Sequence, residues 1–135
     1  MSNATDFYED RLVAYHRGTQ PAAPPANWYI SLHTATTTDA GGGTEVSGGA
    51  YARVAVAAST AQWTASSAGN GTTSNVNAIT FPAATANWGT VVDFAIWDAS
   101  SAGNMWFHGP LTTSRTINSG DTFSFGANAL TIVWA

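Results

Sequence analysis

The sequence predicts an all-β protein: an antiparallel β-sandwich or jelly-roll-like domain of seven or eight strands, preceded by one α-helix. Short segments with apolar residues at every second position recur about every ten residues, separated by turns rich in Gly, Asn, Ser and Asp. At 135 residues the chain is one domain. We expect a helix (1–18), a proline-rich joint (19–26) and a β-sandwich domain (27–135).

Composition excludes several classes of partner. Only 9% of the residues are charged, none is lysine, and the net charge is −4, so there is no basic footprint for nucleic acid. No apolar run approaches the roughly 20 residues of a transmembrane helix. The acidic N-terminus lacks the apolar segment of a secretory signal peptide. We therefore expect neither a nucleic-acid partner nor a membrane partner.

The only segment with helical periodicity is 4–17. Asn3 or Ser2 would cap it, and Gly18 would end it. Its apolar residues fall at i, i+4 and i+7, on one face: Tyr8, Leu12 and Tyr15. Two roles remain open. The helix either closes an open end of the β-domain or docks on a neighbouring subunit, for which an extended joint with three prolines is well suited.

The first half of the β-domain contains predicted strands at 27–34, 51–57, 62–64 and 77–81. In the first of these, Trp28, Ile30 and Leu32 point inward, and Tyr29, Ser31 and His33 point outward. Residues 35–50 are glycine-rich but lack the Gly-Lys-Ser/Thr of a phosphate-binding loop. Asp39 and Glu45 are too few carboxylates for a calcium site. We expect a flexible surface loop there.

The central hairpin is predicted at 88–111, with a polar turn over 99–104. Its first strand, 89–98, places Val92, Phe94 and Ile96 on the core face. In its second strand, 105–111, Met105 and Phe107 share one face. The opposite face of the hairpin would then carry Trp97, Trp106 and His108. Burial in the core or in an interface is the favoured role of this aromatic row, and stacking on a sugar is the alternative. Strands at 122–125 and 130–134 complete the domain.

No arrangement of residues points to catalysis. The chain has no cysteine and no Gly-x-Ser-x-Gly, and its three histidines lack metal-ligand spacing: His16, His33 and His108. Asp93 and Asp98 lie five apart on one strand and so point to opposite faces, which disfavours a two-carboxylate glycosidase site. We expect no enzyme activity, no cofactor and no metal. A small glycan hydrolase is the enzymatic alternative.

Several strings occur in a specific order across residues 28–132: YISLHTA, TEVSGGAYARV, NAITFP, ANWGTVVDFAIWDASSAGNMWFHGPLTT, TINSGDTFSF and ALTI. In this the chain resembles small structural proteins of tailed bacteriophages, which commonly carry the name tail fibre protein. The resemblance implies a virion component assembled in the host cytoplasm. It brings no catalytic residues with it.

A helix on a proline joint, followed by one compact domain without a shaft repeat, suits a protein that clamps to a shell. We therefore expect a capsid decoration, or cement, protein. Its partners would be the major capsid protein, further copies of itself (for example in a trimer), or both. The alternative is a tail fibre, tail-tip or baseplate accessory that binds a host surface glycan. The expected partner interface comprises six residues: Tyr8, Leu12, Tyr15, Arg17, Trp97 and Trp106.

Overall fold

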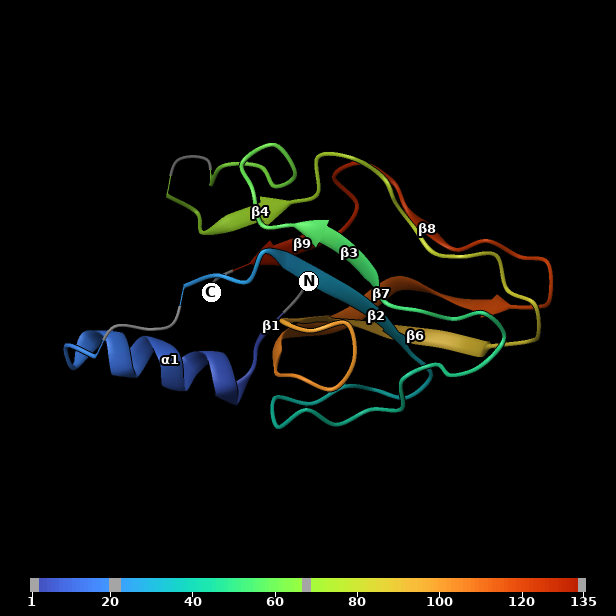
Figure 1. Ribbon diagram of the computed structural model, residues 1–135, viewed down its shortest axis with the longest axis horizontal. Coiled ribbons are helices and arrows are strands. Elements are labelled where there is room, and N and C mark those ends of the chain that lie inside the picture. Colours follow the sequence, from blue (N-terminus) through green and yellow to red (C-terminus); the bar gives the residue numbers. More distant parts are fainter. Residues whose placement is uncertain (1–2, 20–22, 67–68, 134–135) are drawn as a thin grey trace.

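The predicted all-β sandwich is confirmed. A computed structural model describes residues 3–19, 23–66 and 69–133. Within these ranges the chain forms one helix and nine strands (Figure 1): β1 (Asn3–Ala4), α1 (Asp6–His16), β2 (Asn27–His33), β3 (Val54–Ala57), β4 (Thr72–Ser74), β5 (Ile79–Thr80), β6 (Gly89–Trp97), β7 (Met105–Ile117), β8 (Ser124–Phe125) and β9 (Thr131–Val133).

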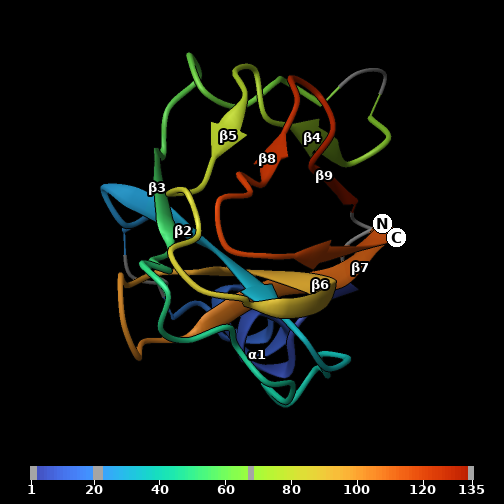
Figure 2. The ribbon, with the colours of Figure 1, turned by 90° about the vertical axis from the view of Figure 1, so that its right-hand side faces the viewer.

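The main layer is a five-stranded antiparallel sheet in the order β1-β7-β6-β2-β3. The predicted central hairpin is its middle, because β6 pairs with both β7 and β2. Two short antiparallel pairs, β4–β9 and β5–β8, lie over one face of this sheet (Figure 2). The helix α1 extends from one end of the sandwich (Figure 1).

The core fills the space between these layers. The alternation predicted for β2 is confirmed on this side, since Ile30 and Leu32 are fully buried. Aromatic rings from the covering segments meet edge to face, with 5.8 Å between the centroids of Phe81 and Phe123 and 5.9 Å between those of Phe94 and Phe125. Such edge-to-face pairs add stability beyond the area they bury. The core therefore depends on interlocking rings as well as on aliphatic side chains.

Two irregularities in the β6–β7 pairing change which face a side chain occupies. In the first, Val91 pairs with Arg115 but Asp93 pairs with Pro110, so four residues of β7 oppose Val92 alone. This irregularity interrupts the regular pairing of β6 and β7 at Val92. The prediction that Val92 joins Phe94 in the core is therefore wrong: Val91 is the fully buried residue, and Val92 is only half-buried.

The second irregularity lies at Trp106. Ile96 pairs with Phe107, but the next residue, Trp97, pairs with Met105, which leaves Trp106 as the extra residue. Met105 and Phe107 consequently lie on opposite faces of the sheet, contrary to the prediction. The predicted row of Trp97, Trp106 and His108 on one face is also wrong, because the bulge turns the Trp106 ring away from the other two.

The glycine-rich segment lies at the surface, as predicted, since most of residues 35–50 are exposed. In addition, residues 34–46 cover the second face of the main sheet, on the side away from β5 and β8 (Figure 2). Thr37 and Val46 in this segment are buried, and Glu45 forms an isolated bridge with His33. His33 and Ser31, which we expected to point into solvent, are therefore buried beneath this loop.

The remaining expectations differ in detail. The strand predicted at 62–64 is reduced to one bridge between Trp63 and Asn75, next to the Thr64 amide, which donates to the Ser74 carbonyl at 2.9 Å. The end of the last predicted strand, at Trp134, lies outside the described residues.

Candidate interface of the arm helix

The helix begins two residues later than predicted. Thr5, not Asn3 or Ser2, is the N-cap, and its hydroxyl accepts a hydrogen bond from the Tyr8 amide at 3.4 Å. The preceding residues Asn3 and Ala4 pair with His108 and Phe107 of β7. They cannot continue a helix while their backbone groups pair with the sheet. The predicted C-terminal end of the helix is confirmed in part. The helix ends at His16, one residue earlier than predicted, and Gly18 follows it with a φ of +84°, which glycine adopts at no steric cost.

Thr5 also attaches the helix to the sheet. Its hydroxyl donates to the carbonyl oxygen of Met105 at 2.6 Å, and its amide donates to that of Trp106 at 3.1 Å. At the first residue of α1, the Asp6 amide donates to the carbonyl of Asp39 in the loop after β2, at 3.2 Å. Sheet and loop together therefore fix the direction in which α1 leaves the domain.

An aromatic cluster packs the first turn of α1 against the end of the sandwich. Tyr8 lies 4.7 Å from the ring centroid of Trp106 and 5.0 Å from that of Phe107. Trp106 also contacts Phe7 and Trp28, each at 5.3 Å. Burial in this cluster raises the pKa of the Tyr8 hydroxyl above its ordinary value. The bulge at Trp106 makes this cluster possible by aiming the indole at the helix.

Beyond this turn the helix is exposed. Leu12 is 44% exposed, Val13 57% and Tyr15 62%. In the described ranges, only Val76, at 38%, joins them as an exposed large hydrophobic residue. Single exposed apolar residues are ordinary, but their concentration on one short helix makes this face a candidate for protein contact.

An apolar cleft runs between α1 and the sandwich. It has a volume of about 340 Å³ and is lined by Tyr8, Arg11, Leu12, Tyr15, Pro24, Trp28 and Trp106. A second hollow of about 510 Å³ shares Tyr8, Pro24 and Trp28 with it and reaches Trp63 and the core residues Ile96, Phe107 and Ile132. Arg11 is the charged residue in the lining of these hollows, and its guanidinium lies 4.8 Å from the Phe7 ring. The cleft suits an apolar protein segment.

The structure brings together four of the six residues expected at the interface: Tyr8, Leu12, Tyr15 and Trp106 all line the cleft. Arg17 is the C-cap residue of α1 and is exposed, but it does not line the cleft. Trp97 lies on the other face of the main sheet. The sequence pattern missed Trp28, which was assigned to the core.

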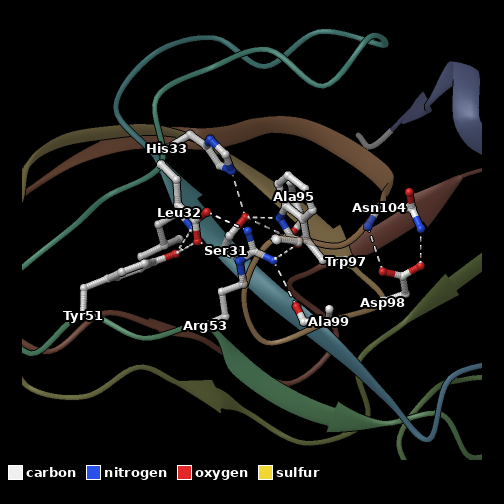
Figure 3. A network of polar contacts seen from close by, with 12 residues as sticks. Ser31, Leu32, His33, Tyr51, Arg53, Ala95, Trp97, Asp98, Ala99 and Asn104 are labelled. Carbon is white, nitrogen blue, oxygen red and sulfur yellow. Dashed lines mark hydrogen bonds and ion pairs between the residues drawn. The ribbon is translucent and has the colours of Figure 1, made fainter.

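Trp97 instead belongs to a buried polar network (Figure 3). Its indole N–H donates to the Ser31 hydroxyl at 2.7 Å, and the Arg53 guanidinium lies 4.0 Å above its ring. Ser31 also hydrogen-bonds Nε2 of His33 at 2.8 Å. Nδ1 of His33 has no partner, and burial lowers the pKa of this imidazole. Since Ser31 and His33 are both buried, this serine–histidine pair is closed to a substrate.

Arg53 connects the cover loop to the hairpin turn. It forms a two-pronged ion pair with Glu45, with both N···O distances at 2.8 Å, and it donates to the carbonyls of Ala99 and Ala102. The Tyr51 hydroxyl donates to the same carboxylate at 2.9 Å. Burial alone would raise the pKa of Glu45, but the hydrogen bonds from Arg53 and Tyr51 outweigh it and hold that pKa below its ordinary value.

A second group ties down the tip of the loop. The amide and the hydroxyl of Thr37 both donate to Oδ2 of Asp93 at 2.7 Å. The same hydroxyl lies 2.9 Å from Nδ1 of His108, whose Nε2 lies 2.6 Å from Oδ1 of Asp39. Thr37, Asp93 and His108 are buried, while Asp39 is exposed at the outer end of the chain of contacts. Together these contacts hold the loop on the sheet.

Across residues 3–19, 23–66 and 69–133, no group of three His, Asp or Glu side chains gathers as metal ligands. In the same ranges, no helix is long and apolar enough to span a bilayer.

The fold and this surface define a small structural protein: a β-sandwich that carries an exposed apolar helix beside an aromatic cleft. A family model described as podophage GP4 fiber I protein gp80 matches residues 3–133, nearly the whole chain. The chain therefore belongs to the Gp80 family, and it is a structural component of a phage virion. No curated protein matches it.

Proposed function

We propose that this chain is a fibre-type subunit of a phage virion appendage, held in the assembly through the exposed face of α1 and the adjoining cleft. The observation that carries the proposal is the gathering of Leu12, Val13 and Tyr15 on one short helix, next to a cleft lined by Trp28 and Trp106. The fibre name of the matching family supports the appendage rather than the shell.

A head-decoration protein is the second candidate. It is favoured by the shape: one compact sandwich with a projecting helix, and a surface with few charges. Such a subunit would use the same helix to contact the major capsid protein and would stabilise the shell through many weak contacts. The two candidates share a binding surface and differ in the location and number of copies.

Binding of a host glycan remains a prediction tied to the fibre role. The aromatic row on which we based it does not form, because Trp106 faces α1 and Trp97 is stacked under Arg53. We also propose that the chain has no catalytic role, an expectation supported by the burial of its serine–histidine pair.

Cryo-electron microscopy of purified virions tests the proposal. Density for this domain in a few copies on the tail would support the appendage role. Regular density on the capsid lattice, in hundreds of copies, would contradict it in favour of decoration. In either position, we expect α1 and its cleft to be covered by protein.

A matched pair of variants tests the surface itself. We expect Leu12→Asp to reduce incorporation into virions about tenfold or more, because it places a charge in an apolar contact. Val76→Asp changes an exposed apolar residue away from α1 and should leave incorporation unchanged. Quantitative mass spectrometry of purified particles measures both. Equal incorporation of the two variants would contradict the role of α1.

A further inference from the structure

One stripe of α1 has a pattern that the cleft does not explain, although one of its residues, Leu12, also borders the cleft. Glu9, Leu12, Val13 and His16 lie at i, i+3, i+4 and i+7, and all four are exposed. This spacing places them along a single face of the helix. We call these four residues the outer stripe. The first turn packs onto Trp106 through Phe7 and Tyr8, so the outer stripe is left open to a partner.

The outer stripe is complementary to itself when two copies run antiparallel. With a two-fold axis between positions 12 and 13, Leu12 of one copy meets Val13 of the other, and Glu9 meets His16. Apolar side chains then contact apolar ones, and a carboxylate meets an imidazole. A parallel pairing would instead place Glu9 against Glu9, which like charges disfavour.

The charge distribution along the helix favours the same direction. Asp6 and Glu9 lie in the first turn and His16 lies in the last. Antiparallel pairing also sets the positive end of one helix dipole beside the negative end of the other. For most of its length α1 stands apart from the sheets (Figure 1), so a second helix can approach it.

We propose that α1 binds the α1 of a second copy of this chain, antiparallel, through the outer stripe. This inference rests on the proposed function, since it names the partner at that surface. A helix of 11 residues is about 16 Å long. Such a pair buries less than the roughly 1,200 Å² of a stable interface. The pairing is therefore weak in dilute solution and becomes effective where copies are held close together in a virion.

Disulfide trapping tests the direction of pairing. The chain has no cysteine, so introduced thiols are the only ones present. We would prepare Glu9→Cys and His16→Cys as two full-length proteins and oxidise each one alone and both together. Antiparallel pairing predicts a mixed 9–16 disulfide in the mixture, identified by mass spectrometry, and at least tenfold less dimer from either protein alone. Equal cross-linking of either protein alone, or none in the mixture, would overturn the proposal.

Sedimentation of the uncrosslinked chain at high concentration gives an independent measurement. We expect Leu12→Asp to weaken self-association at least tenfold and Val76→Asp to leave it unchanged. A wild-type chain that stays monomeric, while Leu12→Asp still prevents incorporation into virions, would overturn the pairing but leave the proposed function standing. Pairing in solution with normal incorporation of Leu12→Asp would support the pairing and overturn the proposed function.

Discussion

Both faces of the five-stranded sheet carry buried side chains, but the two faces are covered in different ways. On one face, Ile30 and Leu32 pack beneath the ring of Phe125 in β8 and beneath aromatic side chains of the loops next to β5 and β8. On the other, Ser31, His33 and Asp93 are buried beneath a glycine-rich loop that is held by hydrogen bonds and an ion pair. β2 supplies residues to both sets, one position apart along the strand.

This difference determines which properties of the covering segment stabilise each face. An apolar face needs volume and shape, and it tolerates exchange of one hydrophobic side chain for another of similar size. A polar face needs a partner for every buried donor and acceptor, so the loss of one group leaves another unsatisfied. The two faces should therefore respond to mutation in different ways.

The largest effect is expected on the apolar face. Phe81→Ala removes a ring that contacts Phe123, Phe125 and Tyr51 and should lower the free energy of unfolding by about 3–5 kcal/mol. Denaturant titration measures it. Phe81→Leu, which keeps more of the volume, is the control and should cost clearly less. A loss below about 1 kcal/mol for the alanine variant would mean that the two layers are not the principal core.

On the polar face, Arg53→Leu should lower the free energy of unfolding by about 2–3 kcal/mol, because it leaves the half-buried Glu45 carboxylate without its cation. The side chain of Glu45 is 27% exposed, so water offsets part of the loss. Adding Glu45→Gln to this variant removes the unpaired charge and should recover part of the stability. If the double variant were no more stable than Arg53→Leu alone, the unpaired Glu45 carboxylate would not be the cause of the lost stability.

A smaller effect is expected at the tip of the cover loop. Thr37→Val removes the hydroxyl shared by Asp93 and His108 and should cost about 1–2 kcal/mol. It should also speed hydrogen exchange at residues 36–42. Thr38→Val changes an exposed hydroxyl of the same loop, whose one partner is the Gly42 amide, and should do neither. Equal exchange rates in the two variants would contradict the anchoring role of Thr37.

The smallest effect is a pH dependence of the polar face. Burial lowers the pKa of His33 below its ordinary value of 6.5, so the unfolded chain takes up a proton before the folded one does. Stability is then highest above pH 6.5 and falls as the pH drops from there toward the folded pKa, by at most about 1.4 kcal/mol per pH unit. Denaturant titrations between pH 5 and 7.5 measure this slope.

His33→Gln should flatten that slope, and the exposed residue His16 supplies the matched control, since His16→Gln should preserve it. Glu45 does not interfere in this range, because its pKa is held below its ordinary value of 4.5. An unchanged slope in His33→Gln would assign the pH dependence to another group.

The sequence predicted the fold class and the position of the central hairpin, because alternation in β2 and β6 is strong. It could not predict the second buried face. Ser31 and His33 look like surface residues, and they become internal only because the loop that directly follows β2 folds back over them. A prediction from alternation also assigns residues to the two faces by odd and even position, which is valid only where the strands pair regularly. The irregularity opposite Val92 and the bulge at Trp106 each change which face the neighbouring residues occupy. Both depend on how β6 pairs with β7, and no pattern within a single strand indicates that pairing.

The candidate interface was predicted in part for a related reason. A helical stripe of Tyr8, Leu12 and Tyr15 is a local pattern, so it could be recognised in the sequence. The cleft wall formed by Trp28 and Trp106 depends on how the hairpin bulges. Thr5 could have been recognised as a capping residue, since it directly precedes the acidic first turn, but the strand pairing of Asn3 and Ala4 carries no sequence signal of its own.

The root of α1 has a consequence for exchanging parts between related proteins. Asn3 and Ala4 belong to the sheet, and Thr5 is buried against Met105. The N-terminal segment that carries α1 is therefore not a detachable module. A chimera joined at the proline segment would lose an edge strand along with the helix. A graft that keeps residues 3–5 and replaces only the helix after them would transfer a new binding specificity onto an intact domain.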